Sequence, residues 1–385
     1  MRSNVRFLCV FLAGFTLAAF AQDKPRARSL GVPFDGTSGP LDAITDIQGV
    51  EVGETTLISG SSIRTGVTAI LPRGKHNNDA VFAGWFSQNG DGEMTGTTWV
   101  EESGFLDGPV MITNTHSVGV VRDAVIAWQA KTGLLPKTNT YGASFFSLPV
   151  VAETFDGRLN DVNGFHVKPE HVFAALENAR SGPVAEGNHG GGTGMRCYGF
   201  KGGTGTASRK LDERSGGYTV GALVQCNCGT RDQLMVAGVP VGREIPESSP
   251  HAAASPPHET EVGSIIIVIA TDAPLLPHQL KRLARRATMG LARTGSTSGN
   301  SSGDIFIAFS TANPDAARPA GVADLKMLPN NEMNGLFTAS AEATEEAIIN
   351  AMVGAETMTG ANNQTVVALP HDGLRQALKK YNRLQ

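Results

Sequence analysis

The sequence predicts an α+β protein whose helices pack on the faces of sheets. Runs rich in β-branched and aromatic residues recur along the chain, and helical patterns lie between them. These strands and helices do not alternate strictly, which favours a layered α+β body over a chain of βαβ units. The 46 glycines and the charged fraction of only 18% indicate closely packed strands with many tight turns. The 385 residues fit one large domain or two ordinary ones.

Six runs are predicted to be strands, because each is apolar, rich in β-branched or aromatic residues and flanked by Gly, Pro or Asn. They are residues 110–113, 147–151, 218–225, 265–270, 305–310 and 366–369. The run Ile-Ile-Ile-Val-Ile-Ala at 265–270 shows no polar alternation. Both faces of that strand should therefore be buried.

Four helices are predicted from starting residues and an apolar period of 3.6. They run from Pro169 to near Gly182, from Pro277 to about Arg293, over 341–352, and from a cap at Asp372 to an inward-facing Tyr381. The outer face of the basic helix 278–293 carries Lys281, Arg282, Arg285 and Arg286. Because the net charge is −4, we interpret these side chains as a solvated face and expect no nucleic-acid binding.

The chain begins with the features of a secretory signal peptide. Arg2 and Arg6 precede an apolar stretch, and Ala19-Phe20-Ala21 fits an A-x-A cleavage site. The apolar stretch is too short to span a bilayer. We therefore expect removal of residues 1–21 and export of the mature chain to the periplasm or the medium, without membrane attachment.

One later segment is predicted to be a linker. Residues 243–257 are rich in Pro, Ser and Ala and show no periodicity, so they cannot bury enough surface to order themselves. The strands that follow are apolar on both faces and need partners from before the segment. The linker should therefore interrupt one domain and not separate two.

Familiar catalytic and cofactor motifs are absent or misplaced. Gly299-Asn-Ser-Ser-Gly303 matches the G-x-S-x-G motif, which in α/β-hydrolases lies on a turn from a strand to a helix. Here the predicted helix comes before the motif and the predicted strand after it, so the motif is not such an elbow. The glycine-rich stretches 187–195 and 199–209 lack the P-loop and dinucleotide patterns, and we interpret them as tight turns whose amides face a cleft. No histidine or cysteine spacing is typical of zinc. We therefore expect neither a metal nor an organic cofactor.

After the signal peptide the chain keeps three cysteines, Cys197, Cys226 and Cys228. An odd number, with two members at i and i+2 on a predicted strand, is not a disulfide framework. We interpret them as small core residues, as free cysteines commonly are.

Gly263 and Ser264 join the linker to the buried strand. A serine hydroxyl needs a base, and a cut before Ser264 would release its own α-amine to serve as one. Such an amine has a pKa of about 7.7–8 and is partly neutral at working pH. Glycine at 263 permits a strained backbone, and residues 243–262 form a flexible leader that can move away after the cut. The junction indicates an enzyme that makes its own N-terminal nucleophile, with an ordinary loop-to-strand junction as the alternative.

Several long motifs in one order resemble the self-processing serine aminopeptidases of the DmpA type, which include β-peptidyl aminopeptidases and L-aminopeptidase/D-amidase-esterases. These motifs are VMITNTHSVG, SLPVVAETFDGRLND, GNHGGGTGMRCYGFKGGTGTASR, YTVGALVQCNCG, EVGSIIIVIATDAPLLP and SSGDIFIAFSTAN. The resemblance runs from about Gly31 to the C-terminus. It implies a four-layer αββα sandwich, similar to N-terminal-nucleophile hydrolases. It also implies a cut at Gly263-Ser264, associated chains 22–263 and 264–385, and homotetramers of these pairs.

The resemblance implies a role for six residues. They are Ser264 as nucleophile, Asn227 as oxyanion donor, Ser302 and Asp304 as the pair that orients the amine and passes its proton, Glu153 as the acid that binds the substrate ammonium group, and Asn114 as part of the same cleft. Phe155 stands where some relatives carry tyrosine, so a role of that hydroxyl does not carry over.

The implied activity is removal of N-terminal β-amino acids, such as β-alanine, from short peptides and amides without a cofactor. An L-aminopeptidase/D-amidase-esterase of the same family is the first alternative. Other amidases of this fold, such as a nylon-oligomer hydrolase or an acetyl-transferring enzyme of arginine synthesis, are expected to carry threonine at the cut. An exported small-molecule binding protein is the alternative from another class, and it predicts one unbroken chain.

Overall fold

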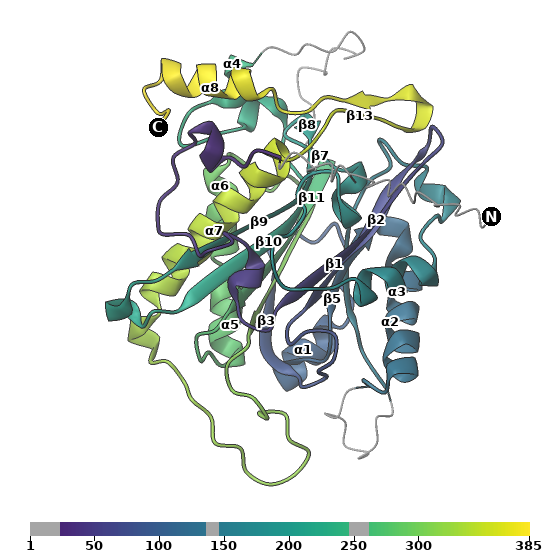
Figure 1. Ribbon diagram of the computed structural model, residues 1–385, viewed down its shortest axis with the longest axis vertical. Helices are drawn as coiled ribbons and strands as arrows, with labels where there is room; N and C mark the ends of the chain where they lie inside the picture. The colour runs from purple at the N-terminus through teal and green to yellow at the C-terminus, as the bar shows by residue number, and fades with distance from the viewer. Residues whose placement is uncertain (1–23, 136–145, 246–261) are drawn as a thin grey trace, which may run out of the picture.

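The computed structural model describes residues 24–135, 146–245 and 262–385 (Figure 1). Its strands form two large sheets with the orders β1-β2-β5-β6 and β4-β3-β12-β11-β10-β9, and two small ladders, β7-β8 and β13-β14. The strands are β1 Glu51–Ser59, β2 Ile63–Leu71, β3 Val81–Ser87, β4 Phe105–Leu106, β5 Val110–Asn114, β6 Val150–Thr154, β7 Arg196–Cys197, β8 Phe200–Lys201, β9 Gly203–Lys210, β10 Thr219–Asn227, β11 Val262–Thr271, β12 Ser301–Ser310, β13 Met358–Thr359 and β14 Thr365–Val366. The predicted signal peptide and most of the predicted leader lie outside the described residues.

Helices cover the outer face of each large sheet (Figure 1). The helices are α1 Thr97–Ser103, α2 Val118–Thr132, α3 Pro169–Glu177, α4 Val241–Glu244, α5 Pro277–Ala284, α6 Ala287–Arg293, α7 Asn334–Val353 and α8 His371–Lys380. α2 and α3 pack on the four-stranded sheet, whereas α5 and α7 pack on the six-stranded sheet with α6 against α7. The result is the predicted four-layer αββα sandwich.

The position of strand β11 in the sandwich explains why residues 265–270 are apolar without interruption. Ile265, Ile267 and Ile269 join the core between the six-stranded sheet and its helices. Ile266 and Val268 face the other way, into the core between the two sheets. A central strand in a four-layer sandwich has no solvated face, so the polar half of the usual alternation is lost.

The predicted linker connects neighbouring strands of one sheet. β10 ends at Asn227 and β11 begins at Val262, and the two strands pair antiparallel over most of their length. β11 also pairs with β12 in parallel. Residues before and after the predicted cut therefore contribute adjacent strands to a single sheet.

The glycine-rich stretch 187–195 does not line a cleft, so that part of the interpretation is wrong. Its 3₁₀ turn, Gly190–Gly194, is fully buried and lies between the two large sheets. A Cβ at Gly191 would lie 2.0 Å from Gln225 Oε1 and 2.8 Å from the Ile112 carbonyl oxygen, which belong to opposite sheets. Glycine is required at this position because the two sheets approach so closely here that a side chain would not fit between them.

Several helix boundaries differ from the prediction. The helix predicted from Pro277 is two helices, α5 and α6, and α7 begins seven residues before the predicted start. Asp372 is the second residue of α8 and not its cap, and Tyr381 is 43% exposed. The strands β1, β2, β3 and β9 and the helix α2 were not predicted.

The basic side chains of α5 and the turn after it are partly exposed, as predicted, and also contact groups of the same chain. The Arg282 and Arg286 guanidinium groups lie 5.2 and 4.0 Å from the ring centroid of Phe337. Lys281 forms an ion pair with Glu101 at 2.7 Å. Because these basic groups already contact aromatic rings and a carboxylate of the same chain, they give no reason to expect a polyanion there.

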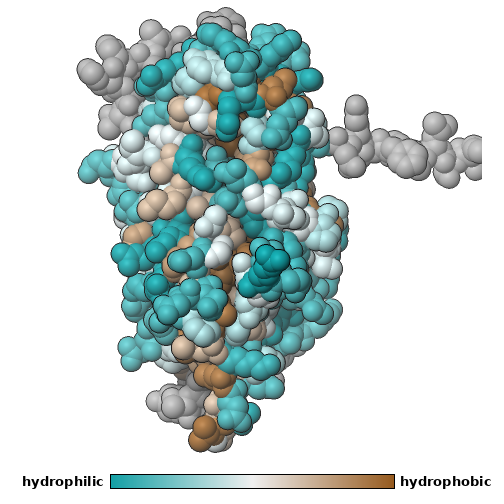
Figure 2. All heavy atoms as spheres, turned by 90° about the vertical axis from the view of Figure 1, so that its left-hand side faces the viewer, coloured by the Kyte–Doolittle hydropathy of each residue, from teal (hydrophilic) through white to brown (hydrophobic). Residues whose placement is uncertain are grey.

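Among the described residues, no helix is both long enough and apolar enough to cross a membrane. The face shown in Figure 2 is mostly polar, with apolar side chains scattered over it. The loop between β12 and α7 projects from the lower end of the molecule (Figures 1 and 2) and carries three exposed apolar residues, Val322, Leu325 and Met327.

Candidate active site

A cleft of about 380 Å³ opens at the N-terminal end of β11. Gly263 and Ser264 line it from β11, and Glu153 lines it from β6 in the opposite sheet. Glu93, from the loop after β3, and Thr115, directly after β5, complete its polar wall. The cleft is therefore built from both sheets at the same end of the sandwich.

Ser264 is held between two strands and is only 6% exposed. It is paired with Asn227 on β10 and with Gly303 on β12. The Gly303 N–H donates to Ser264 Oγ at 3.1 Å, which fixes the hydroxyl beside the cleft. Gly263 and Ser264 are consecutive residues of strand β11.

The packing of β10 gives a further reason for glycine at position 263. Gly263 is not among the residues with positive φ, so its backbone is not strained in the left-handed sense. A Cβ at this position would lie 2.3 Å from the Asn227 carbonyl oxygen and 3.0 Å from Cys228 Cα. A larger residue would push β11 away from β10 at the nucleophile.

Ser302 and Asp304 form a buried pair beside the nucleophile. Ser302 Oγ donates to Asp304 Oδ1 at 2.5 Å, and the Ile265 N–H donates to the same oxygen at 3.2 Å. Both side chains are fully buried, and Ser302 is the register partner of Gly263. Asp304 thereby orients the Ser302 hydroxyl and holds the backbone immediately after Ser264.

Asn227 presents its amide in one orientation. Its Oδ1 accepts a hydrogen bond from the Arg196 N–H at 2.9 Å. Because a backbone N–H can only donate, the oxygen faces Arg196 and the Nδ2 group remains available as a donor. Asn227 is paired with Ser264, so this donor lies on the strand next to the nucleophile.

Glu153 is a buried carboxylate at the other wall of the cleft, 3% exposed. Its Oε1 accepts from the Glu93 N–H at 3.0 Å, and its Oε2 accepts from Thr115 Oγ1. Burial raises the pKa of Glu153 above its ordinary value, while these two hydrogen bonds oppose the rise. A buried carboxylate in this setting gains most from a cationic ligand that replaces the lost water.

Asn114 is close to the cleft but is not one of the residues that line it. Its Nδ2 donates to Thr65 Oγ1 and to Asp156 Oδ2, both at 2.9 Å. Burial raises the pKa of Asp156 to about 6. Asn114 supports the strand end from which Thr115 reaches Glu153, and its predicted substrate contact stays a prediction.

Sequence reasoning missed the loop that follows β3 and the hydroxyl of Thr115. The Asp91 N–H donates to the Ser302 carbonyl at 3.2 Å, and two residues later Glu93 binds Glu153. This loop connects the two walls of the cleft. Thr115 lies inside the quoted motif VMITNTHSVG, which is the one signal that could have singled it out.

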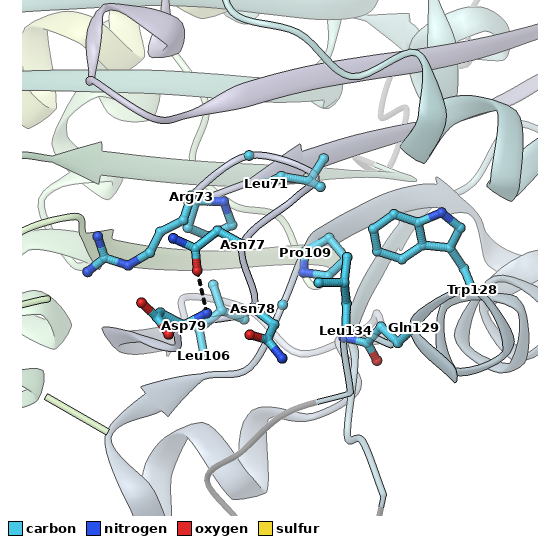
Figure 3. Close-up of a pocket in the computed structure, with 13 residues that line it drawn as sticks. Leu71, Arg73, Asn77, Asn78, Asp79, Leu106, Pro109, Trp128, Gln129 and Leu134 are labelled. Atoms are coloured by element: carbon cyan, nitrogen blue, oxygen red, sulfur yellow. Dashed lines mark hydrogen bonds between the residues drawn. The ribbon is translucent and has the colours of Figure 1, made fainter. Parts of the chain in front are cut away.

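A second cavity lies at the far end of β5, next to Gly108 and Pro109 (Figure 3). Trp128 and Gln129 of α2 stand on one side of it, and Arg73 and Asp79 stand on the other. Its volume of about 20 Å³ holds about one water molecule, and no predicted site residue lines it.

Within the described part of the chain, one group of side chains is arranged closely enough to hold a metal ion, and it consists of three thiols. Cys197, Cys226 and Cys228 are buried and form no disulfide within the described residues, as the sequence led us to expect for core cysteines. Burial raises the pKa of Cys226, and hydrogen bonding to the other two thiols, followed by burial, raises that of Cys228. The spacing along the chain did not indicate that all three converge.

Comparison with known proteins identifies the family. Residues 42–366 match the model of peptidase family S58. The chain belongs to peptidase family S58. The predicted resemblance is thereby confirmed, and so is the expected enzyme class, a serine peptidase.

Relatives within and near the S58 family cover almost the whole chain. A protein named beta-peptidyl aminopeptidase BapA from Sphingosinicella microcystinivorans is 54% identical, with 97% of each chain covered. A solved L-aminopeptidase D-ala-esterase/amidase from Ochrobactrum anthropi, described as a variant of the Ntn hydrolase fold, is 48% identical with a TM-score of 0.85. It covers 94% of this chain and 100% of its own. A Burkholderia sp. beta-aminopeptidase is 46% identical with a TM-score of 0.83, covering 92% of this chain and 99% of its own.

Proposed function

We propose that this S58 peptidase is a β-peptidyl aminopeptidase that cuts itself between Gly263 and Ser264. It then removes N-terminal β-amino acids from short peptides and amides. The observation that carries this proposal is the position of Ser264 at the end of a buried strand, in one cleft with the buried carboxylate Glu153. The two relatives named beta-peptidyl aminopeptidase support the choice of substrate.

Self-cleavage begins with attack of Ser264 Oγ on the carbonyl carbon of Gly263. The C–N bond breaks, the Ser264 nitrogen takes up the hydroxyl proton, and an ester forms between the two residues. Water then hydrolyses the ester, leaving a carboxylate on Gly263 and a free amine on Ser264. The hydrogen bond from Gly303 N–H positions the hydroxyl for this attack.

In the mature enzyme the new α-amine is the general base. It accepts the Ser264 hydroxyl proton as Oγ attacks the substrate carbonyl, and it returns that proton to the leaving amine. Asn227 Nδ2 donates to the oxyanion, an interaction worth about 3–4 kcal/mol in comparable sites. The Ser302–Asp304 pair orients the α-amine, and water completes deacylation.

Glu153 determines which end of the substrate enters the cleft. Its carboxylate, fixed by Thr115 and the Glu93 N–H, binds the substrate ammonium group by a charge-assisted hydrogen bond. A β-amino acid places this ammonium group one carbon further from the carbonyl than an α-amino acid does. The span from Glu153 to Ser264 therefore selects between the two classes of substrate.

The substrate assignment is tested with three p-nitroanilides that carry β-alanyl, L-alanyl and D-alanyl groups. We expect the highest kcat/KM on the β-alanyl compound. The similarity to the L-aminopeptidase D-ala-esterase/amidase makes that activity the second candidate. Equal or faster turnover of the L-alanyl or D-alanyl compound assigns the chain to this second activity.

Self-cleavage is tested with two substitutions of the nucleophile. Wild-type protein should give two bands on a denaturing gel, the smaller starting with Ser264-Ile265-Ile266. Ser264→Ala should remain one inactive chain, whereas Ser264→Cys keeps a nucleophile and should still be cut, more slowly. A Ser264→Ala protein that is cut at the same bond would contradict the mechanism.

We further propose that residues 1–21 are removed on export. We also propose that chain 22–263 (the α chain) and chain 264–385 (the β chain) stay paired, and that four such αβ pairs assemble into a homotetramer. The charged start, apolar stretch and A-x-A site support export. The exposed apolar side chains on the loop between β12 and α7 supply a surface that assembly would bury. N-terminal sequencing should find Gln22 first, and light scattering should give the mass of four pairs, not one.

A further inference from the structure

Three cysteine side chains meet behind the oxyanion donor. The Sγ atoms of Cys197 and Cys228 are 3.7 Å apart, and those of Cys226 and Cys228 are 3.9 Å apart. All three sulfurs lie within 4.8 Å of one another. The thiols come from β7, from β10 and from the residue after β10, and each is at most 1% exposed.

These separations match a trigonal metal–sulfur centre better than a disulfide. Bonds of about 2.3 Å, as in zinc thiolates, place three sulfurs in a plane about 4.0 Å apart. A disulfide requires about 2.05 Å between sulfurs, well below the 3.7 Å between Cys197 and Cys228. Two of the three separations, Cys197–Cys228 and Cys226–Cys228, are therefore already close to what a three-coordinate ion needs, and the third is within 4.8 Å.

The donor set selects the ion. In the described ranges no imidazole or carboxylate joins the three thiols. Structural zinc is almost always four-coordinate, so a site with three sulfurs and no fourth ligand does not suit it. Soft sulfur ligands also select Cu(I). We propose that Cys197, Cys226 and Cys228 form a binding site for one Cu(I) ion.

A buried lysine can offset part of the negative charge of the loaded site. Burial lowers the pKa of Lys201 to about 7, while negative charge at Cys197 and Cys226 raises it, so thiolates in the loaded site would favour its ammonium form. Its Nζ donates to the carbonyl oxygens of Gly192 and Gly202, which holds it in place. Binding of Cu(I) breaks three S–H bonds, forms three Cu–S bonds and releases three protons to the solvent, and no electron is transferred.

The site is connected to the active centre through Asn227, which lies between Cys226 and Cys228 in the chain. Its Oδ1 accepts from the N–H of Arg196, the neighbour of Cys197. A bound ion would tie β7 to the end of β10 and so fix the two segments that orient the oxyanion donor. The ion itself takes no part in the reaction.

The test uses processed wild-type enzyme, reduced and kept free of oxygen. Cu(I) is added in competition with the chromophoric chelator bicinchoninate, with incubation to a constant reading because the thiols are buried. We expect one Cu(I) per αβ pair, three Cu–S contacts by X-ray absorption and a raised unfolding temperature. Binding of Zn²⁺ in place of Cu(I), or no stoichiometric Cu(I) at all, would overturn the proposal.

Matched variants distinguish the site from general thiol binding or misfolding. Cys197→Ser and Cys226→Ser should each lower Cu(I) affinity by more than the 10–100-fold typical of an outer-shell change. Tyr198→Phe removes the hydroxyl bonded to Thr294 but leaves the three sulfurs, and it should bind Cu(I) as wild type does. Equal loss in all three variants, or a Cys197–Cys228 disulfide in peptides from anaerobically purified protein, would contradict the proposal.

Discussion

At the scale of single residues, we expect Asp304 to connect the proposed nucleophile Ser264 to its proton relay. One carboxylate oxygen accepts both the Ser302 hydroxyl and the Ile265 N–H. We expect Asp304→Ala to lower kcat by about 10²–10⁴-fold, because it releases the hydroxyl that orients the base. Asp304→Asn keeps an acceptor and should lose less. Steady-state kinetics on the β-alanyl substrate, with little change in KM, checks this prediction.

The same substitution should slow self-cleavage, because the uncut chain already shows the Ser302–Asp304 contact. The rate at which the precursor band disappears on a gel measures this effect separately from turnover. If Asp304→Ala matured and turned over like wild type, the pair would be a packing feature and no part of the mechanism.

The burial of Glu153 leads to a prediction about how KM depends on pH. Burial raises its pKa above 4.5, and only the ionised form attracts the substrate ammonium group. KM should therefore be low above this raised pKa and should increase as the pH falls through it. Glu153→Gln should raise KM by about 10–100-fold, the value of a charge-assisted hydrogen bond of about 1.5–3 kcal/mol, and remove this dependence.

A second group titrates in the same experiment. The Ser264 α-amine must be neutral to act as a base, so kcat should also fall toward low pH, near its pKa of about 7.7–8. The Glu153→Gln enzyme should keep this dependence of kcat. A KM for wild type that stays constant down to pH 4 would show that Glu153 does not bind the substrate cation.

Some residues of the candidate site could be predicted from the local sequence, some only from the resemblance, and some only from the structure. Ser264 could be identified because a serine at the start of an apolar strand, after a proline-rich segment, is a local pattern. Glu153 and Asn227 came only from the resemblance, since nothing local distinguishes them. Thr115 joins the site through a hydrogen bond whose partner lies 38 residues away, which no local pattern encodes.

At the scale of elements, glycine decides where strands and helices approach most closely. β9 was missed because its sequence, GTGTASRK, lacks the large apolar residues of a typical core strand. Gly205 in this strand has no room for a side chain, because a Cβ would lie 2.1 Å from the Ala347 carbonyl oxygen of α7. Small residues here are the signature of close packing and not of a loop.

A pair of glycine-to-alanine substitutions tests this explanation. Gly205→Ala should lower the free energy of unfolding by at least about 1–3 kcal/mol, because α7 must move away from the sheet. Gly119→Ala in α2 meets no atom within 4 Å and should raise it by up to about 1 kcal/mol. Urea unfolding measures both. A Gly205→Ala protein as stable as wild type would mean that α7 does not pack on β9 as described.

At the scale of the whole molecule, the four layers follow from the strands that need cover on both faces. The apolar run 265–270 predicted a strand buried on both faces, and the two faces of β11 lie in the core under the helices and in the core between the sheets. The four layers themselves were implied only by the resemblance. The order of strands could not be predicted. β11 pairs with β10 from before the linker and with β12 from after it, and a sequence does not state which edges meet.

This strand order determines what the proposed cut between Gly263 and Ser264 would do to the molecule. Residues 264–385 supply β11 and β12, which lie in the middle of the six-stranded sheet between β3 and β10. The proposed cut falls two residues into β11, so of its ten register pairs with β12 only Val262–Ser301 and Gly263–Ser302 would be divided between the two chains. Cleavage should leave nearly all the sheet and both cores intact.

We therefore expect the two chains to co-elute in native buffer and to separate only when the whole protein unfolds. Processed wild type and the uncut Ser264→Ala precursor should unfold at temperatures within a few degrees of each other at equal concentration. Each should show one cooperative transition, because neither chain alone completes the six-stranded sheet or the core between the two sheets. Calorimetry combined with size exclusion at low urea checks this. Release of the 264–385 chain before the main transition would mean that β11 is not a central strand of the mature enzyme.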